Sequence, residues 1–276
     1  MSFSIQTNVN SIVAQENLRV NGEFQSRTIE RLTSGYRINS SGDDAAGLAV
    51  ANGFRSSIAE VQQGVRNAND GISTLQIIDG GLNNISKILV RLKTLATQSA
   101  SGTFQGDRTV LNNEFNALLG EIDRQAANVG LSSVASAGGG NNVSLSVYIG
   151  GGDPQVSVDL SGTNNRADST GLSLDASVIT DPTTALAAIG AVSAAVSYLG
   201  KVQGVVGTGQ NQLQYAIQLA QSQISSYSAA ESRIRDADVA AEAANLTKAQ
   251  VLQQASIAAM AQANSAPTAV LSLLRG

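Results

Sequence analysis

The chain has 276 residues, 42% of them hydrophobic, with 17 basic and 21 acidic side chains and a net charge of −4. It contains no Cys and no His, which excludes disulfides, thiol or imidazole catalysis, and metal sites built from Cys or His. The low charge gives no electrostatic case for binding nucleic acid or an anionic membrane, and an aromatic content of 4% favours helix seams over a thick globular core.

The first predicted element is a helical segment within residues 1–41. Its apolar positions, which mark helix faces, include Ile5, Val9, Ile12 and Leu32. The N-terminus has neither a basic leader region nor a continuous apolar stretch, and no run of 18 apolar residues occurs elsewhere. We therefore expect no cleaved signal peptide and no membrane span, so export would act on an uncleaved chain.

Residues 42–131 predict a long helix followed by a shorter one. Asp43 and Asp44 precede the long helix, where capping and the helix dipole explain two carboxylates better than a metal site does. Apolar residues of the long helix, residues 43–99, recur at spacings of three and four, as in a coiled-coil seam. Members of this seam are Phe54, Ile58, Val61, Ile72 and Leu75.

The shorter predicted helix spans residues 107–128. Its apolar residues are spaced by four, three and four, so it can complete a small antiparallel bundle with the longer helices. These residues are Leu111, Phe115, Leu118 and Ile122.

The middle of the chain, residues 132–181, is rich in Gly, Ser and Asn and predicts a β-hairpin. Residues 143–149 alternate apolar and polar side chains, which is typical of a strand with one buried face, and residues 155–160 supply a second strand. A third strand near residues 172–178 is left open. The glycine runs in this region lack the spacing of a phosphate-binding loop, so they are interpreted as turns.

A second long helix is predicted for residues 182–231. Apolar residues fall seven apart along it, and Ile189, Val196, Ile217 and Ile224 are expected at intervening positions. The residues with this spacing are Val192, Leu199, Val206, Leu213 and Ala220. Gly204, Gly207 and Gly209 each destabilise a helix by about 1 kcal/mol relative to Ala, so a local break is expected there.

The last predicted helix lies in residues 232–276. Its apolar positions include Val239, Leu246, Leu252, Leu271 and Leu274. Both chain ends lie beyond the hairpin and bundle, and the surface left to pack against is the other end or a neighbouring copy. Segments that bury too little apolar area to offset about 1 to 2 kcal/mol of backbone entropy per residue should order on association.

The predicted fold is therefore mainly α. It consists of a long antiparallel, coiled-coil-like helical bundle from both chain ends, a small β-hairpin region in the middle, and no large outer domains. We expect a self-associating structural protein that is not an enzyme and uses no cofactor.

Several stretches at both ends resemble those of bacterial flagellin. In the first half these are RLTSG at 31–35, RINS at 37–40, DDAAG at 43–47 and RNANDGIS at 66–73. In the second half they are SRI at 232–234, DAD at 236–238, KAQVLQQ at 248–254, AQAN at 261–264 and VLSLL at 270–274. The resemblance covers about residues 1–130 and 183–276. Arg235 departs from it, because an acidic residue is common at that position.

The resemblance implies an extracellular subunit of the bacterial flagellar filament, exported by the flagellar type III apparatus. It implies that residues 1–41 and 232–276 pair as the inner filament core, with a bundle of 42–131 and 182–231 around it. The hairpin and loop of 132–181 would form the outer face. Implied partners are many copies of the chain, the filament cap, hook-associated junction proteins and an export chaperone.

Residues 88–96 are similar to the segment by which the vertebrate Toll-like receptor for flagellin recognises this family. Arg91 and Leu95 match key positions, and Glu114 on the next helix matches a third. The departures from the best-recognised pattern are Val90, Lys93 and Thr94. The alternative interpretation is that Arg91 and Glu114 form an ion pair between two helices.

Two other functions remain as alternatives. A hook-filament junction protein of the same assembly has similar chain ends but is disfavoured by the complete C-terminal motif. An enzyme, such as a carboxylate-dependent hydrolase in the middle segment, is the second. An inserted metallopeptidase with an HExxH motif is excluded because the chain has no His.

Overall fold

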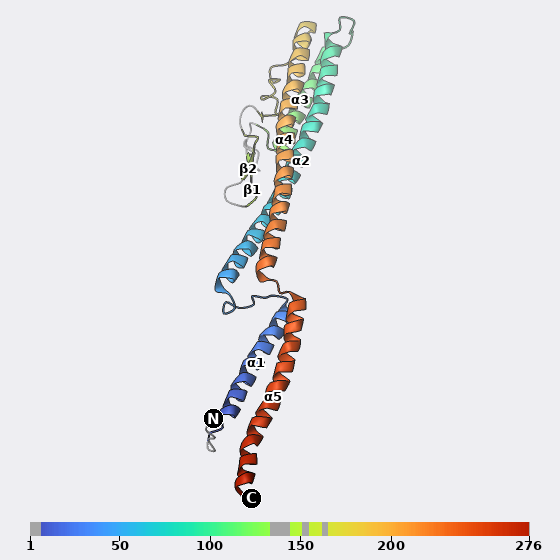
Figure 1. Cartoon of the computed structure of the whole chain (residues 1–276). Helices are drawn as coiled ribbons and strands as arrows, with labels where there is room; N and C mark the ends of the chain where they lie inside the picture. The colour runs from blue at the N-terminus through green and yellow to red at the C-terminus, as the bar shows by residue number, and fades with distance from the viewer. Residues whose placement is uncertain (1–6, 133–143, 151–154, 162–164, 276) are drawn as a thin grey trace. The chain divides into compact units, whose positions relative to one another are not determined.

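A computed structural model describes residues 7–132, 144–150, 155–161 and 165–275, with only the helix course for 266–275. The elements are α1 (Val9–Ser34), α2 (Ala45–Ala100), α3 (Arg108–Asn128), β1 (Ser144–Tyr148), β2 (Gln155–Asp159), α4 (Pro182–Arg235) and α5 (Val239–Arg275) (Figure 1). Two compact units result: a terminal unit of Met1–Ser56 with Ser226–Gly276, and a central unit of Ser57–Ser225. This confirms the mainly α fold with a small central hairpin.

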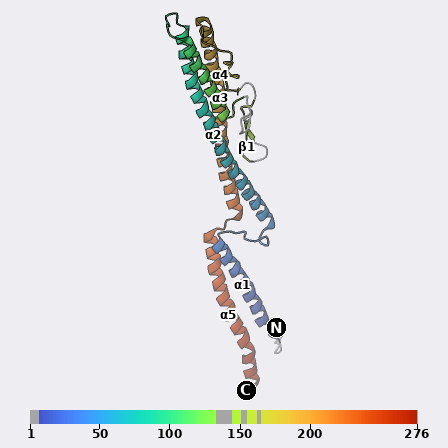
Figure 2. The same ribbon diagram turned by 180° about the vertical axis from the view of Figure 1, so that it is seen from behind.

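In the central unit, α2, α3 and α4 run side by side, as both opposite views show (Figure 1, Figure 2). Asp107 caps α3, because its carboxylate accepts a hydrogen bond from the Thr109 backbone N–H at 2.8 Å. The fully buried stripe of α2 includes Leu75, Leu82, Ile85, Leu89 and Leu92, each 0% exposed. A core of this kind stabilises the central unit within a single chain.

The buried face of α3 differs from the prediction at one position. Leu119 is 8% exposed and joins Leu111, Phe115 and Ile122 in the core, whereas the predicted Leu118 is only partly buried. At about 100° per residue, Leu119 lies about 40° from Phe115 around the helix and Leu118 about 60° on the other side. The periodicity therefore located the right face but selected the wrong one of two adjacent leucines.

The buried line of α4 follows spacings of three and four almost from the start of the helix. It consists of Ala185, Ala188, Val192, Ala195, Leu199, Val202, Val206, Gly209 and Leu213. One predicted intervening position is wrong, because Val196 is 39% exposed and Ala195 is buried instead, whereas Ile189 is partly buried. Small residues occupy the seam here, so side-chain size was a poor guide to which face is buried.

One 18-residue window of α4 has a mean hydropathy of 1.5, and 33% of that window is buried. By length and composition alone this helix could cross a membrane, although a packed core helix passes the same test. The window still contains no unbroken run of 18 apolar residues, as expected from the sequence, because Ser and Gly interrupt it.

The hairpin lies directly on the backbones of two helices. Leu145 pairs with Val158 and Val147 with Val156 in an antiparallel register, and Val147 and Val158 are buried. Three helix glycines make room for the strands. A Cβ at Gly64 would overlap the Ile149 carbonyl oxygen, one at Gly71 would lie 2.9 Å from a Val147 methyl, and one at Gly209 would lie 2.6 Å from a Val158 methyl.

The break expected near Gly209 does not occur, since α4 is one continuous helix from Pro182 to Arg235. Gly209 is instead explained by the close approach of β2, for which a side chain would leave no room. Gly209 therefore allows the strand to pack closely and does not break the helix.

The third strand near residues 172–178 is also wrong. The Leu172 N–H donates to the Asp168 carbonyl at 2.9 Å and the Leu174 N–H to the Ser169 carbonyl at 2.8 Å, which makes successive turns. Leu172 and Leu174 are nonetheless buried, at 4% and 0% exposure. The two leucines alternate with polar residues because both side chains point into the core from a segment of turns.

The terminal unit contains α1, α5, the first turns of α2 and the last turns of α4. Asn8 caps α1 by accepting from the Ser11 N–H at 3.1 Å, and Gly35 ends the helix with a φ of 75°, which favours glycine. Phe54 of α2 stacks on Tyr227 of α4 with ring centroids 5.9 Å apart. Arg55 lies beside Glu231, with 3.6 Å between nitrogen and oxygen.

Candidate functional site

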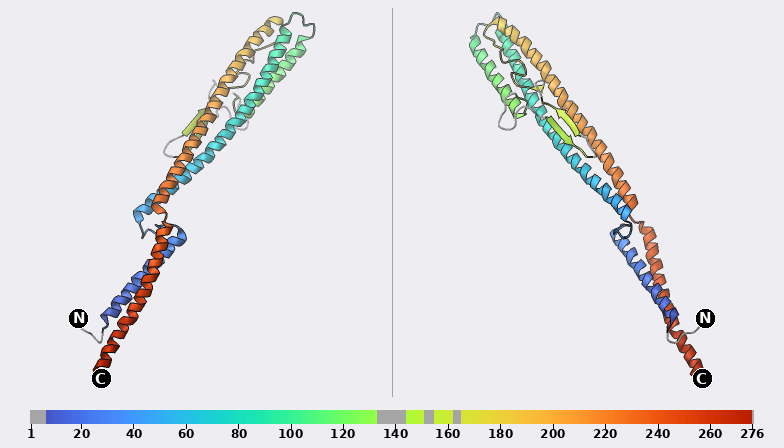
Figure 3. Two further views of the ribbon diagram at one scale, coloured as in Figure 1. Left: turned by 45° about the vertical axis from the view of Figure 1, so that its right-hand side comes forward. Right: turned by 90° about the vertical axis from the view of Figure 1, so that its left-hand side faces the viewer.

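The candidate site is the antiparallel pair of α1 and α5, which lie side by side in every view (Figure 3). Polar contacts set the register along the pair. The Asn8 amide donates to the Ala263 carbonyl at 2.7 Å, and the Asn21 amide donates to the Ser256 hydroxyl at 3.0 Å. At the opposite end, Arg31 donates to Glu242 at 3.2 Å. The two chain ends therefore match along the length of α1.

The seam between the two helices is made of small and polar side chains. Ala14 is 8% exposed, Thr28 2%, Glu242 7% and Ala249 0%. The Thr28 hydroxyl donates to the Phe24 carbonyl of its own helix at 3.0 Å, so its burial leaves the hydroxyl satisfied. Because this seam is built of small and polar side chains, the spacing of large apolar residues does not predict it.

The large apolar side chains of the pair lie outside the seam. At 37 to 61% exposure, they are Val9, Ile12, Val13, Val20, Ile29, Val239, Val251, Leu252 and Ile257. At about 100° per residue, Val13 and Ile29 lie about 160° apart around α1, and Val251 lies about 160° from the buried Ala249 on α5. The exposed apolar surface therefore surrounds the pair instead of forming one stripe.

Four of the six predicted filament-core residues whose side chains the structure describes lie on this exposed surface. Val9, Ile12, Val239 and Leu252 are exposed, and Leu32 and Leu246 are partly buried. Ile5 lies outside the described residues, as do the side chains of Leu271 and Leu274.

The predicted bundle-seam residues are distributed differently. Four of them are fully buried in the central unit: Val61, Leu75, Leu199 and Leu213. The others are partly buried, namely Phe54, Ile58, Ile72, Ile217 and Ile224.

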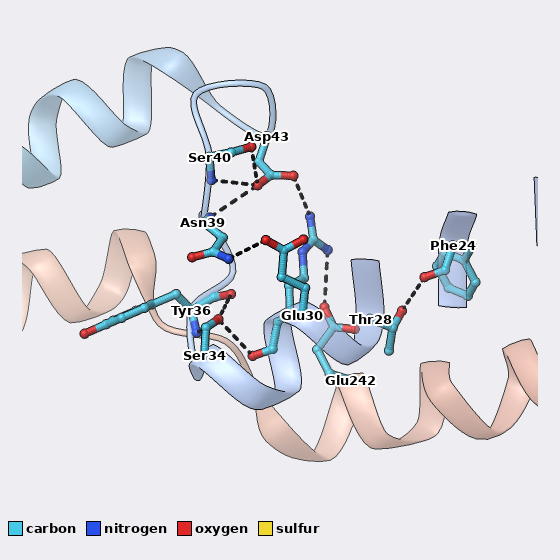
Figure 4. Close-up of polar contacts among 10 residues, drawn as sticks. Phe24, Thr28, Glu30, Ser34, Tyr36, Asn39, Ser40, Asp43 and Glu242 are labelled. Atoms are coloured by element: carbon cyan, nitrogen blue, oxygen red, sulfur yellow. Dashed lines mark hydrogen bonds and ion pairs between the residues drawn. The ribbon is translucent and has the colours of Figure 1, made fainter. Parts of the chain in front are cut away.

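A polar junction closes the upper end of the pair, where α1 ends and α5 begins (Figure 4). The Arg31 guanidinium lies 3.2 Å from Glu242 of α5 and 3.9 Å from Asp43 of the turn before α2. Asn39 donates to the Glu30 carboxylate at 2.6 Å. One arginine thus links α1, α5 and the turn that leads into α2.

The two aspartates before α2 accept hydrogen bonds from different backbone segments. Asp44 caps the helix by accepting from the Gly47 N–H at 2.8 Å, as the sequence predicted. Asp43 instead closes the preceding turn: it accepts from the Ser40 N–H at 3.1 Å and the Asn39 N–H at 3.2 Å, and these bonds lower its pKa. Within the described residues, no group of three potential metal ligands occurs.

The turns on either side of the pair are bonded to each other. The Arg37 N–H donates to the Arg235 carbonyl at 2.6 Å, and the Ala237 N–H donates to the Gly35 carbonyl at 2.9 Å. The Arg235 guanidinium lies 4.2 Å from the centre of the Tyr36 ring, which is a cation–π geometry. The unusual arginine at this position therefore has a definite partner.

The three receptor-related residues lie in the central unit. Arg91 of α2 and Glu114 of α3 form an ion pair at 2.6 Å, which agrees with the alternative interpretation of these residues. Both side chains are accessible, at 56% and 41% exposure, whereas Leu95 is only 1% exposed. Leu95 packs in the core and does not present its side chain to a partner.

Comparison with known proteins identifies the family. Residues 5–130 match the bacterial flagellin N-terminal helical region, and residues 189–274 match the bacterial flagellin C-terminal helical region. The flagellin of Halalkalibacterium halodurans is 37% identical over 273 residues, covering 98% of this chain and 99% of the relative. The flagellar filament 33 kDa core protein of Treponema phagedenis is 35% identical, with coverage of 98% and 99%.

A crystal structure of Bacillus cereus flagellin is 26% identical, covers 56% of this chain and 88% of its own, and has a TM-score of 0.47. The assignment rests on the sequence matches, which extend over nearly the whole chain and its relatives. On that evidence, the chain belongs to the bacterial flagellin family.

Proposed function

We propose that this flagellin builds its filament through the α1–α5 pair. As a flagellin, the chain is a structural subunit of the bacterial flagellar filament, assembled outside the cell. In the proposed arrangement, residues 1–41 and 232–276 form the inner core, 42–131 and 182–231 the surrounding bundle, and 132–181 the outer face. The observation that carries this proposal is the apolar surface around the pair.

The energetic reason is that the pair cannot complete its burial within one chain. Covering a Val or Ile side chain contributes about 1.5–3 kcal/mol, and these side chains point to several sides of the pair. Neighbours on more than one side are needed to bury them, which a helical lattice of identical copies provides. Low overall charge limits repulsion between those copies.

Deletion of residues 1–40 tests the proposal. We expect the full chain to form long filaments alone under the electron microscope, and the truncated chain to remain unassembled with its central unit helical by circular dichroism. A hook-filament junction protein would form no long filaments by itself. Normal filaments from the truncated chain would refute the role given to the pair.

The remaining partners are proposed from the resemblance. They are the filament cap, the hook-associated junction proteins and an export chaperone, with no role for nucleic acid, a membrane, a cofactor or catalysis. Export without cleavage is proposed from the resemblance as well. Mass spectrometry of assembled filaments tests it, because a shortened N-terminus would contradict an uncleaved export route.

Recognition by the Toll-like receptor for flagellin is proposed through Arg91 and Glu114, whose side chains are accessible. Leu95 would act indirectly, by supporting the helix that carries Arg91. We expect an Arg91→Ala, Leu95→Ala double variant to lose receptor signalling. Unchanged signalling would contradict the proposal, and a Lys87→Ala variant on the same helix serves as a control.

A further inference from the structure

Gly22 lies in the interior of α1, where glycine destabilises a helix relative to alanine because it has more conformational freedom to lose. Gly64, Gly71 and Gly209 are explained by the hairpin that lies on them. A Cβ added at Gly22 would meet no atom within 4 Å. Among the described residues, therefore, none requires a glycine at this position.

Gly22 lines a surface hollow of about 470 Å³ on α1. Its other lining residues are Ile12, Gln15, Glu16, Leu18 and Arg19. Ile12 is 55% exposed, and the charges of Glu16 and Arg19 are paired with each other. The hollow thus offers apolar side chains and a rim whose charges are already neutralised.

We propose that an apolar side chain from α5 of a second copy fills this hollow, an inference that rests on the proposed filament function. α5 has no charged residue between Lys248 and Arg275, and its Val251 and Ile257 are 60% and 50% exposed. It can therefore enter the hollow without burying a charge. Contact between two α1 helices would instead place one Glu16–Arg19–Glu23 ladder, with its net negative charge, against another.

Substituting Gly22 tests the inference, because a side chain at this position has two opposite effects on filament assembly. Gly22→Ala raises helix propensity, which by itself favours an ordered α1 and easier assembly. Steric exclusion of the second copy makes assembly harder. We expect the critical concentration for filament formation to rise for Gly22→Ala, and by about tenfold or more for Gly22→Leu, as overpacking of an interface predicts.

Gly120→Ala is the matched control, since this exposed helix glycine of α3 also has no atom within 4 Å of an added Cβ. It should leave the critical concentration unchanged. An unchanged or lower value for both Gly22 variants would overturn the inference. Helix content measured on the monomers shows whether Gly22→Leu folds, and Gly22→Ala keeps the test valid if it does not.

Cross-linking identifies the occupant. Because the natural chain has no Cys, single variants Gln15→Cys, at the rim of the hollow, and Val251→Cys or Ile257→Cys can be mixed and oxidised after assembly. A Gln15–α5 dimer that forms only in filaments supports the inference, and its absence from both mixtures contradicts it. Failure of the unmodified chain to form filaments would instead contradict the proposed function.

Discussion

The central unit and the terminal pair use their large apolar side chains in opposite ways. In the central unit, Leu75, Leu89 and Phe115 are fully buried, although some large apolar side chains such as Ile77 remain exposed. In the terminal pair, Ala14 and Ala249 fill the seam while Val13 and Val251 face outward. The difference shows that one region completes its core within the chain and the other leaves it to be completed by assembly.

Truncating a core side chain of the central unit should give the largest change in the free energy of unfolding. Phe115 is 0% exposed, so Phe115→Ala should lower the free energy of unfolding by about 3–5 kcal/mol through lost burial and a residual cavity. Denaturant titration followed by circular dichroism measures it. Val110→Ala on the same helix, where the side chain is 63% exposed, should change that free energy by less than about 0.5 kcal/mol.

The reverse pattern is expected in the terminal pair. Val251→Ser should leave the monomer's free energy of unfolding nearly unchanged, because Val251 is 60% exposed. In filaments, losing about 1.5–3 kcal/mol of burial should raise the critical concentration about tenfold or more, measured by sedimentation. Gln250→Ser, at the exposed neighbouring position, is the control. An equal shift for both variants would show that Val251 is not buried by assembly.

Glycine substitutions sharpen the comparison inside the central unit. Gly64→Ala should destabilise it by about 1–3 kcal/mol, since the new Cβ would overlap the Ile149 carbonyl oxygen. Gly200→Ala, where no atom lies within 4 Å, should stabilise α4 by up to about 1 kcal/mol. Thermal unfolding measures both. Similar melting temperatures for the two variants would contradict the close packing of the hairpin against α2.

Acid should produce the smallest effect, in the turn beside the pair. Hydrogen bonds from the Ser40 and Asn39 N–H groups lower the pKa of Asp43 in the folded chain. Its carboxylate therefore contributes stability above the unfolded pKa of about 3.9, and this contribution is lost as pH falls through the lower folded pKa. Melting temperatures of the chain and of Asp43→Asn should differ at pH 7 and converge as the pH falls below the lowered pKa of Asp43. A constant difference would contradict this.

Periodicity predicted the central unit well because that unit buries its large residues. The stripe through Val61 and Leu75 and the α4 line through Leu199 and Leu213 are both buried, and the cap at Asp107 begins α3. Errors arose where small residues pack. Ala195 is buried where the larger Val196 was expected, since closely packed helices leave little room between them.

Other errors came from contacts that one segment cannot reveal. Gly209 could be explained only by the strand that lies against it, and Leu172 and Leu174 only by the core beneath their turns. For the candidate site, the exposed Val9 and Ile12 were named from the sequence, but Ala14, Thr28 and Glu242 were not. The Arg31–Glu242 pair joins residues 211 apart, and no local pattern predicts such a partner.

The hydrogen bond from Asn8 to Ala263 joins residues 255 apart, which has a consequence for the order of folding. Contacts between elements close in sequence, such as α2 and α3, have short loops to close, whereas the pairing of α1 with α5 must wait for almost the whole chain. We expect the central unit to fold first and the pair to form last. A newly exported subunit would thus form the apolar surface of the α1–α5 pair only after its central unit has folded.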